Sequence, residues 1–282
     1  MVDELASGVL LIFALSVLAF AAGRQIRERR VSQCFFAALI ASLLFAWMLS
    51  GKLLWASLLP NPAVVFLSNL MPVLLGFAAG LASSASALSR FSRPSATLAF
   101  VALSVAYVVT PYARPILYPV EVASQTAWRG DVCLQSHSST CAPAAAVTLL
   151  ALDGVPTTER EMVEACLTSE RGTEPLGLYR GVAIAAHRAG FAAKVAKSEP
   201  ALWDQMSHLP NISLVQLDPT AQSNTPRRLL GPRGGEGHAV VVMGRDAAGN
   251  WRIADPAFGM TTWTDEQFRS RFTGDAIYIV AR

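Results

Sequence analysis

The stretch Thr140-Cys141-Ala-Pro-Ala-Ala-Ala-Val-Thr-Leu-Leu-Ala-Leu152 decides the fold of the second half of the chain. An apolar run of this length, with Pro143 in its first turn, predicts a helix over Ala142–Leu152 directly after Cys141. The partial positive charge at a helix N-terminus favours the thiolate, which is the nucleophilic form of cysteine. Cys141 is therefore a candidate nucleophile, and a buried structural cysteine is the alternative.

Two later strands supply candidate partners for this thiol. His238 opens the run His238-Ala-Val-Val-Val-Met243, and Asp255 closes the run Trp251-Arg-Ile-Ala-Asp255. A hairpin that pairs Arg245 with Asn250 makes His238 and Asp255 diagonal neighbours on one face. The carboxylate can then hold one ring nitrogen and leave the other facing a nucleophile. The alternative is a strand-edge histidine beside a turn aspartate.

A glutamine lies upstream of the thiol. Gln135 precedes Cys141 by six residues, and its side-chain amide can join the backbone N–H of Cys141 in an oxyanion hole. His137 is a rival base, but it is local in sequence and lacks an acidic partner. Cys133, His137 and Cys141 lack the second ligand pair of a zinc site, so we expect no metal and no cofactor. Cys133 and Cys166 are a possible disulfide pair, or else two buried thiols.

The segment Gln135-Ser-His-Ser-Ser-Thr-Cys141-Ala-Pro-Ala resembles the Q-x5-C-x-x-A motif of the papain-like double-glycine leader peptidases. These bacteriocin-processing cysteine peptidases are found fused to peptide-exporting ABC transporters. The resemblance continues through Gly237-His238-Ala-Val, Asp255-Pro-Ala-Phe-Gly259 and Thr264–Ile279, and it covers about residues 131–282. It implies that Cys141 is the nucleophile, His238 the base, Asp255 the orienting acid and Gln135 the oxyanion donor. The family often has glycine where this chain has Ala142.

Helices and strands are mixed around these motifs. Helices are expected first, and strands cluster towards the C-terminus, which favours an α+β domain over a wound parallel sheet. The expected helices are Ala142–Leu152, Thr158 to about Leu167, Leu176–Ala189, Ala201–Ser207 and one near Asp265–Phe272. The expected strands are Phe191–Ala196, Ser213–Leu217, Ala239–Met243, Trp251–Ala254 and Ala276–Val280. The Pro-, Gly- and Arg-rich segment Asp218–Gly237 is expected to be a long loop that flanks a substrate cleft.

The composition divides the chain of 282 residues at about residue 118. Hydrophobic residues make up 52% and charged residues 15%, and the mean hydropathy is +0.39. Residues 1–118 hold eight Lys/Arg and three Asp/Glu, whereas residues 119–282 hold fifteen and seventeen, so the net charges of +5 and −2 give the total of +3. We predict a four-helix transmembrane anchor over 1–118 and a papain-like peptidase domain over 119–282. The small net charge gives no indication of nucleic-acid binding.

Four uncharged stretches in the first part fit one bilayer span each. They are Leu5–Gly23, Val31–Gly51, Ala63 to about Ser83 and Pro94–Ala113. No Asp, Glu, Lys, Arg or His lies inside them, so no proton or ion path is expected in the membrane. This distribution disfavours a transporter subunit and favours an anchor.

The loop charges predict an orientation. The loops after the first span and before the fourth span hold six arginines, and the opposite side holds only Lys52 and Arg114. The positive-inside rule places the arginine-rich loops in the cytoplasm and both termini outside it. The first span is preceded by Asp3 and Glu4 and followed by the basic cluster, which is the reverse of a secretory signal.

These observations predict a membrane-anchored cysteine peptidase of the bacterial inner membrane, with its peptidase domain outside the cytoplasm. Its expected partners are exported peptide or protein substrates, cleaved after Gly-Gly or other small residues, the lipid bilayer, and a separate transporter or secretion system. A non-catalytic peptide-binding module and an acyl or peptidyl transferase that uses the same thiol are the alternatives.

Overall fold

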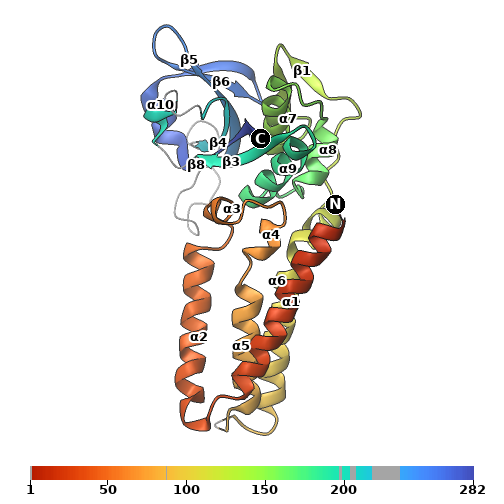
Figure 1. Ribbon diagram of the computed structural model, residues 1–282, viewed down its shortest axis with the longest axis vertical. Helices are drawn as coiled ribbons and strands as arrows, with labels where there is room; N and C mark the ends of the chain where they lie inside the picture. The colour runs from red at the N-terminus through yellow and green to blue at the C-terminus, as the bar shows by residue number, and fades with distance from the viewer. Residues whose placement is uncertain (1, 87, 197–198, 204–207, 218–235) are drawn as a thin grey trace, which may run out of the picture. The chain divides into compact units, whose positions relative to one another are not determined.

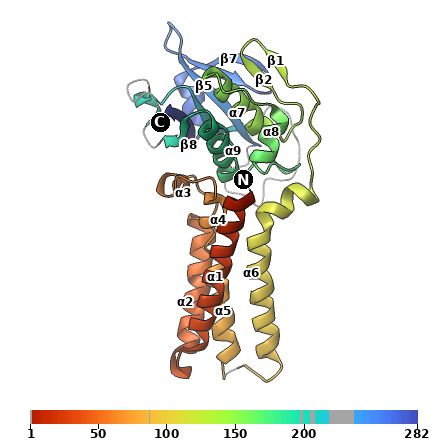
Figure 2. The same cartoon turned by 45° about the vertical axis from the view of Figure 1, so that its right-hand side comes forward.

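The computed structural model describes residues 2–86, 88–196, 199–203, 208–217 and 236–282. The chain divides into two compact units. The first comprises Met1–Trp55 and Asn61–Leu117, and the second comprises Ala56–Pro60 and Tyr118–Arg282. Figures 1 and 2 show the helices of the first unit in red to yellow and the mixed second unit in green to blue.

The first unit is entirely helical in its described residues. Its helices are α1 (Val2–Arg24), α2 (Glu28–Met48), α3 (Leu54–Leu58), α4 (Val64–Leu67), α5 (Met71–Ser84) and α6 (Ser92–Leu117). Four stretches are long and apolar enough to cross a membrane, namely Ala6–Arg24, Glu28–Met48, Val64–Ser84 and Ser92–Leu117. These stretches confirm the four predicted spans. The third span is interrupted between α4 and α5.

Polar side chains satisfy backbone carbonyls beside this interruption. The Asn69 side-chain amide donates a hydrogen bond to the Tyr107 carbonyl at 3.0 Å. The Ser104 hydroxyl donates to the carbonyl of Pro72, also at 3.0 Å. A bilayer offers no water to polar groups, so these two bonds satisfy polar groups within the protein and join the third span to α6.

Helices α1 and α5 touch through glycines. A Cβ atom on Gly80 of α5 would lie 2.2 Å from the Phe20 carbonyl oxygen, and one on Gly76 would lie 2.6 Å from that of Ser16. On the opposite helix, a Cβ atom on Gly23 would lie 2.5 Å from the Phe77 carbonyl oxygen. Gly76 and Gly80 form a G-x-x-x-G pattern, which lets two membrane helices approach to backbone contact. This pattern explains why α5 is the central helix of the unit.

Gly80→Ala should destabilise the helical unit, because the new methyl group meets backbone that cannot move aside alone. We expect a loss of about 1–3 kcal/mol, the usual cost of overpacking. Gly8→Ala is the matched control, since its Cβ atom would meet nothing closer than 3.4 Å. The thermal midpoint of the detergent-solubilised chain should fall in the first variant and not in the second. Equal midpoints would show that the close packing is dispensable.

The second unit is an α+β domain, which confirms the predicted fold class. Six antiparallel strands form one sheet in the order β3-β8-β4-β5-β6-β7. They are β3 (Phe191–Ala196), β4 (Asn211–Leu217), β5 (Glu236–Arg245), β6 (Trp251–Asp255), β7 (Gly259–Trp263) and β8 (Phe272–Ala281). A separate hairpin, β1 (Ala127–Arg129) and β2 (Val132–Leu134), contacts β7 (Figure 2).

The helices of this unit are α7 (Cys141–Leu152), α8 (Glu159–Ala165), α9 (Pro175–Arg188) and α10 (Asp265–Arg271). Figure 1 shows α7, α8 and α9 together on one side of the sheet and α10 on the other. Each begins and ends where the sequence predicts, within two residues. Thr158 and Glu161 form a capping box at the start of α8, and Gly190, with φ +84°, follows the end of α9.

One predicted helix of this unit needs correction, one predicted loop lies largely outside the described residues, and three strands are missing from the prediction. The helix predicted over Ala201–Ser207 is a short 3-10 turn, η1 (Pro200–Leu202), and residues 204–207 lie outside the described residues. The long loop predicted over Asp218–Gly237 also lies outside them, except that Glu236 and Gly237 already belong to β5. Strands β1, β2 and β7 were not predicted, because they are short and carry no clear alternation.

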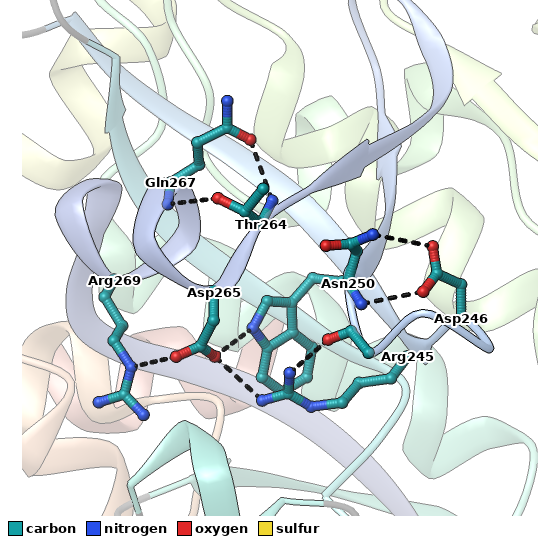
Figure 3. A network of polar contacts seen from close by, with 9 residues as sticks. Arg245, Asp246, Asn250, Thr264, Asp265, Gln267 and Arg269 are labelled. Atoms are coloured by element: carbon teal, nitrogen blue, oxygen red, sulfur yellow. Dashed lines mark hydrogen bonds and ion pairs between the residues drawn. The ribbon is translucent and has the colours of Figure 1, made fainter.

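An aromatic cluster between the sheet and α10 holds the β5–β6 hairpin. Trp203, Trp251 and Phe268 are fully buried and pack edge-on or tilted against one another. Figure 3 shows the polar network at the rim of this cluster, where Asp265 accepts hydrogen bonds from Arg245, Trp251 and Arg269. The bond from Arg269, followed by those from Arg245 and Trp251, lowers the pKa of Asp265 to about 2. The hairpin is therefore anchored at the end remote from His238.

The hairpin register agrees with the prediction near the site and differs near the turn. Val242 lies opposite Ile253 and Val241 opposite Ala254, as predicted, but Arg245 lies opposite Trp251 rather than Asn250. A β-bulge between Val242 and Gly244 inserts one extra residue into β5 and causes the shift. Gly244 has φ +135°, a value that residues with a Cβ atom rarely adopt for steric reasons, so glycine makes the bulge possible.

Candidate active site

Cys141 begins α7, and a closely bonded loop fixes its position. The buried Thr140 precedes it, and the Thr140 hydroxyl both donates to the His137 carbonyl (2.8 Å) and accepts from the His137 N–H (3.1 Å). The Ser139 hydroxyl donates to the Glu170 carbonyl, which ties the loop to the segment before α9. The first N–H groups of a helix have no intrahelical acceptor, so they point into the space beyond its N-terminus. The Cys141 side chain is partly exposed there.

His238 and Asp255 meet across the β5–β6 pair. The distance between His238 Nε2 and Asp255 Oδ1 is 2.8 Å. Their side chains are only 9% and 4% exposed, so the bond is shielded from water. Asp255 Oδ1 also accepts the Ala257 N–H at 2.8 Å, which fixes the carboxylate. The bond uses Nε2, so Nδ1 is the ring nitrogen left for the thiol.

Cys141 and His238 line the same cleft, and the thiol acts on the imidazole. Burial alone would lower the pKa of His238, but the hydrogen bonds to Asp255 and then to Cys141, with the negative charges of both groups, raise it to about 9. A raised histidine pKa beside a cysteine stabilises an imidazolium paired with a thiolate. The structure thus brings together three of the four predicted site residues as a Cys–His–Asp chain.

A cavity of about 1000 Å³ opens on this chain. Cys141, Ala142 and the segment Glu170–Pro175 line one wall, and residues of β4, β5 and β8 line the other. Two alanines and two glycines, Ala142, Gly172, Gly237 and Ala239, lie along it. The cavity is an open cleft between helices and sheet, and its volume is sufficient for part of a peptide.

Gln135 is close to the cleft in sequence but does not line it. Its side-chain Nε2 donates to the His137 carbonyl at 3.0 Å, and its backbone N–H donates to the Pro256 carbonyl at 2.9 Å. Gln135 Oε1 is buried and has no hydrogen-bond partner among the described residues. An amide nitrogen carries two hydrogens, so one donor of Gln135 is engaged within the loop.

The remaining candidates have other environments. His137 Nδ1 accepts the Ser139 N–H at 3.2 Å, so this nitrogen is occupied within the loop. Cys133 and Cys166 are free and fully buried, so of the two alternatives the structure has two separate buried thiols. Burial is the main cause that raises the pKa of each of these thiols to about 12. Among the described residues, no group of three His, Cys, Asp or Glu side chains is arranged to hold a metal ion.

The antiparallel sheet, the helix that begins at the thiol and the cleft between them define a papain-like, cysteine-peptidase-type domain. Residues 129–282, more than half of the chain, match the sequence model of the Peptidase C39 family. The chain belongs to this family. The match confirms the assignment made from the sequence motifs, and four apolar helices precede the matched domain.

Relatives of this domain occur in archaea and bacteria. Two uncharacterized proteins, from Methanothermobacter thermautotrophicus and Methanothermobacter marburgensis, are 32% and 29% identical over 162 residues, which is 57% of this chain and 96% of each relative. Among solved structures, the peptidase domain of Streptococcus ComA, a bi-functional ABC transporter, is 25% identical, with 53% of this chain and 96% of that chain covered and a TM-score of 0.41. A double glycine motif protease from an AMS/PCAT transporter, in complex with the leader peptide, is 22% identical, with 57% and 97% covered and a TM-score of 0.42.

The raised pKa of His238 predicts a pH-dependent preference between alkylating reagents. The imidazolium attracts anionic iodoacetate, and this attraction is present below pH 9 and lost as the pH rises through about 9. The ratio of iodoacetate to iodoacetamide rates at Cys141 should fall across that range. In Asp255→Asn this fall in the rate ratio should occur at a pH lower by about one unit or more, because the negative charge that stabilises the imidazolium of His238 is removed. A ratio that already falls near pH 6.5 in the unmodified protein would contradict the raised pKa.

Proposed function

We propose that the chain is a membrane-anchored cysteine peptidase whose catalytic residues are Cys141, His238, Asp255 and Gln135. The single observation that carries this proposal is the shielded Cys141–His238–Asp255 chain at the edge of the cleft. The chain belongs to the Peptidase C39 family, so a peptide is the substrate class that the cleft is proposed to take. Cleavage after Gly-Gly or other small residues, which the sequence resemblance suggests, is part of this proposal.

The proposed reaction begins with the thiolate. Cys141 Sγ attacks the scissile carbonyl carbon, and the protonated His238 gives its Nδ1 proton to the leaving amine as the C–N bond breaks. The acyl group remains on sulfur as a thioester. Water then attacks the thioester, His238 takes up its proton, and the C–S bond breaks to release the carboxylic product and restore the thiolate beside the imidazolium. Asp255 keeps the imidazole in the required orientation throughout.

The oxyanion of each tetrahedral intermediate requires donors. The backbone N–H of Cys141 is one, and the second side-chain N–H of Gln135 is the other, since its first N–H is bonded to the His137 carbonyl. A modest rotation of the Gln135 amide on substrate binding would complete this pair. Apo sites often tighten in this way when the substrate arrives.

Replacement of Cys141 tests the peptidase. Peptide-library cleavage by the solubilised chain should disappear in Cys141→Ala, because no other described thiol combines exposure with a histidine partner. Gln135→Ala should reduce the cleavage rate by about 10²–10³-fold through loss of one oxyanion donor. Cys34→Ala is the control, because Cys34 is also partly exposed but lies outside the proposed site. This variant should cleave peptides at the unmodified rate. Selective peptide binding without cleavage in the unmodified protein would instead identify a binding module, and amine-capped products would identify a transferase.

We propose further that the peptidase domain lies outside the cytoplasm. The six arginines in two connecting loops support this orientation. Its substrates are then exported proteins or peptides, delivered by a separate transporter or secretion system.

Protease added to intact spheroplasts should therefore digest the C-terminal domain. The positive-inside rule places that domain on the accessible side of the membrane, and immunodetection of a C-terminal tag measures its loss. Digestion after lysis is the control. Protection in intact spheroplasts would place the domain in the cytoplasm and favour leader peptides as substrates.

A further inference from the structure

One buried acid of the second unit has no part in the proposed reaction. Glu159, at the start of α8, is only 2% exposed. Its Oε1 accepts the backbone N–H of Ser136 at 2.9 Å. Its Oε2 is buried and has no hydrogen-bond partner among the described residues. A buried carboxylate costs free energy, so its presence there calls for a physical reason.

Glu159 is held rigidly. Thr158 and Glu161 form the reciprocal capping box that fixes the first turn of α8. The Glu159 N–H donates to the Thr126 hydroxyl at 3.3 Å. These contacts set the position of the carboxylate independently of the residues it binds, so it can act as a fixed support.

The residue that Glu159 supports, Ser136, is connected to two parts of the proposed site. Ser136 directly follows Gln135, whose backbone N–H donates to the Pro256 carbonyl at 2.9 Å. Pro256 follows Asp255 in a turn closed by the Phe258 N–H to Asp255 carbonyl bond (3.1 Å) and the Ala257 N–H to Asp255 Oδ1 bond (2.8 Å). The hydrogen bonds of two consecutive residues, Gln135 and Ser136, therefore join Glu159 to the turn that orients Asp255.

We propose that Glu159 is a positioning residue that holds the Gln135–Ser136 segment after β2 and, through Pro256, the turn of Asp255 against His238. This inference rests on the proposed function. The property that matters is the acceptor oxygen of Glu159 facing the Ser136 N–H. Its negative charge is not required.

The test compares Glu159→Ala, which removes the acceptor, with Glu159→Gln, which keeps an acceptor and removes the charge. Glu164→Ala, an exposed acid on the same helix, is the matched control. The rate of Cys141 alkylation by iodoacetamide is followed against pH in the full solubilised chain, with Cys141→Ala as background. The thermal midpoint is measured alongside.

In Glu159→Ala the alkylation rate near pH 6.5 should fall by about ten- to a hundredfold, because small displacements of reacting groups cause losses of this size. The pH of half-maximal rate should rise, because a poorly held Asp255 supports the imidazolium less. Glu159→Gln and Glu164→Ala should stay within about twofold of the unmodified protein. If Glu159→Ala fails to fold, Glu159→Asp, which draws the oxygen back from Ser136, should shift the profile in the same direction.

Two results would overturn the inference about Glu159 and leave the proposed peptidase function standing. Either Glu159→Ala reacts as the unmodified protein does, or Glu159→Gln loses as much as Glu159→Ala, which would make charge the operative property. If the unmodified protein shows no alkylation above the Cys141→Ala background, the proposed peptidase itself fails and the inference falls with it.

Discussion

The hydrogen bond between His238 Nε2 and Asp255 Oδ1 is the constraint on which the second unit depends. It requires two strands in one register, a turn that presents a carboxylate, and enough burial to exclude water. The β5–β6 pairing supplies the register, the Asp255–Phe258 turn fixes the carboxylate, and the aromatic cluster beneath α10 holds the hairpin. Cys141 then needs only to begin a helix at the correct distance, which the bonded loop before α7 ensures.

The first unit obeys a different constraint, because lipid gives no hydrophobic force between helices. The glycines of α5 permit backbone contact with α1, while α2 and α6 present large apolar side chains such as Phe36, Trp47 and Leu98 outward. Hydrogen bonds from Asn69 to the Tyr107 carbonyl and from Ser104 to the Pro72 carbonyl join the interrupted third span to α6. The low charge content of the whole chain is thus an average over two units whose packing follows different physical constraints.

Much of this could be predicted from sequence, for identifiable reasons. The four spans follow from length and charge alone, and α7–α10 follow from apolar periodicity and capping residues. The register at Val242 and Ile253 follows from hairpin geometry. The bulge at Gly244 could not be placed, since one glycine in a strand does not say which partner residue is skipped. The burial of Glu159 depends on tertiary contacts with Ser136 and Thr126, which lie 23 and 33 residues away, and local sequence patterns do not report such contacts.

The two buried thiols have a consequence for oxidation. With pKa values raised to about 12, Cys133 and Cys166 remain protonated and cannot attack an oxidised sulfur. A sulfenic acid formed at Cys141 would thus find no resolving thiolate at either position, and its rescue requires a small thiol or reductase from outside the chain. The activity of the site is then coupled to the reducing capacity of whichever compartment surrounds it.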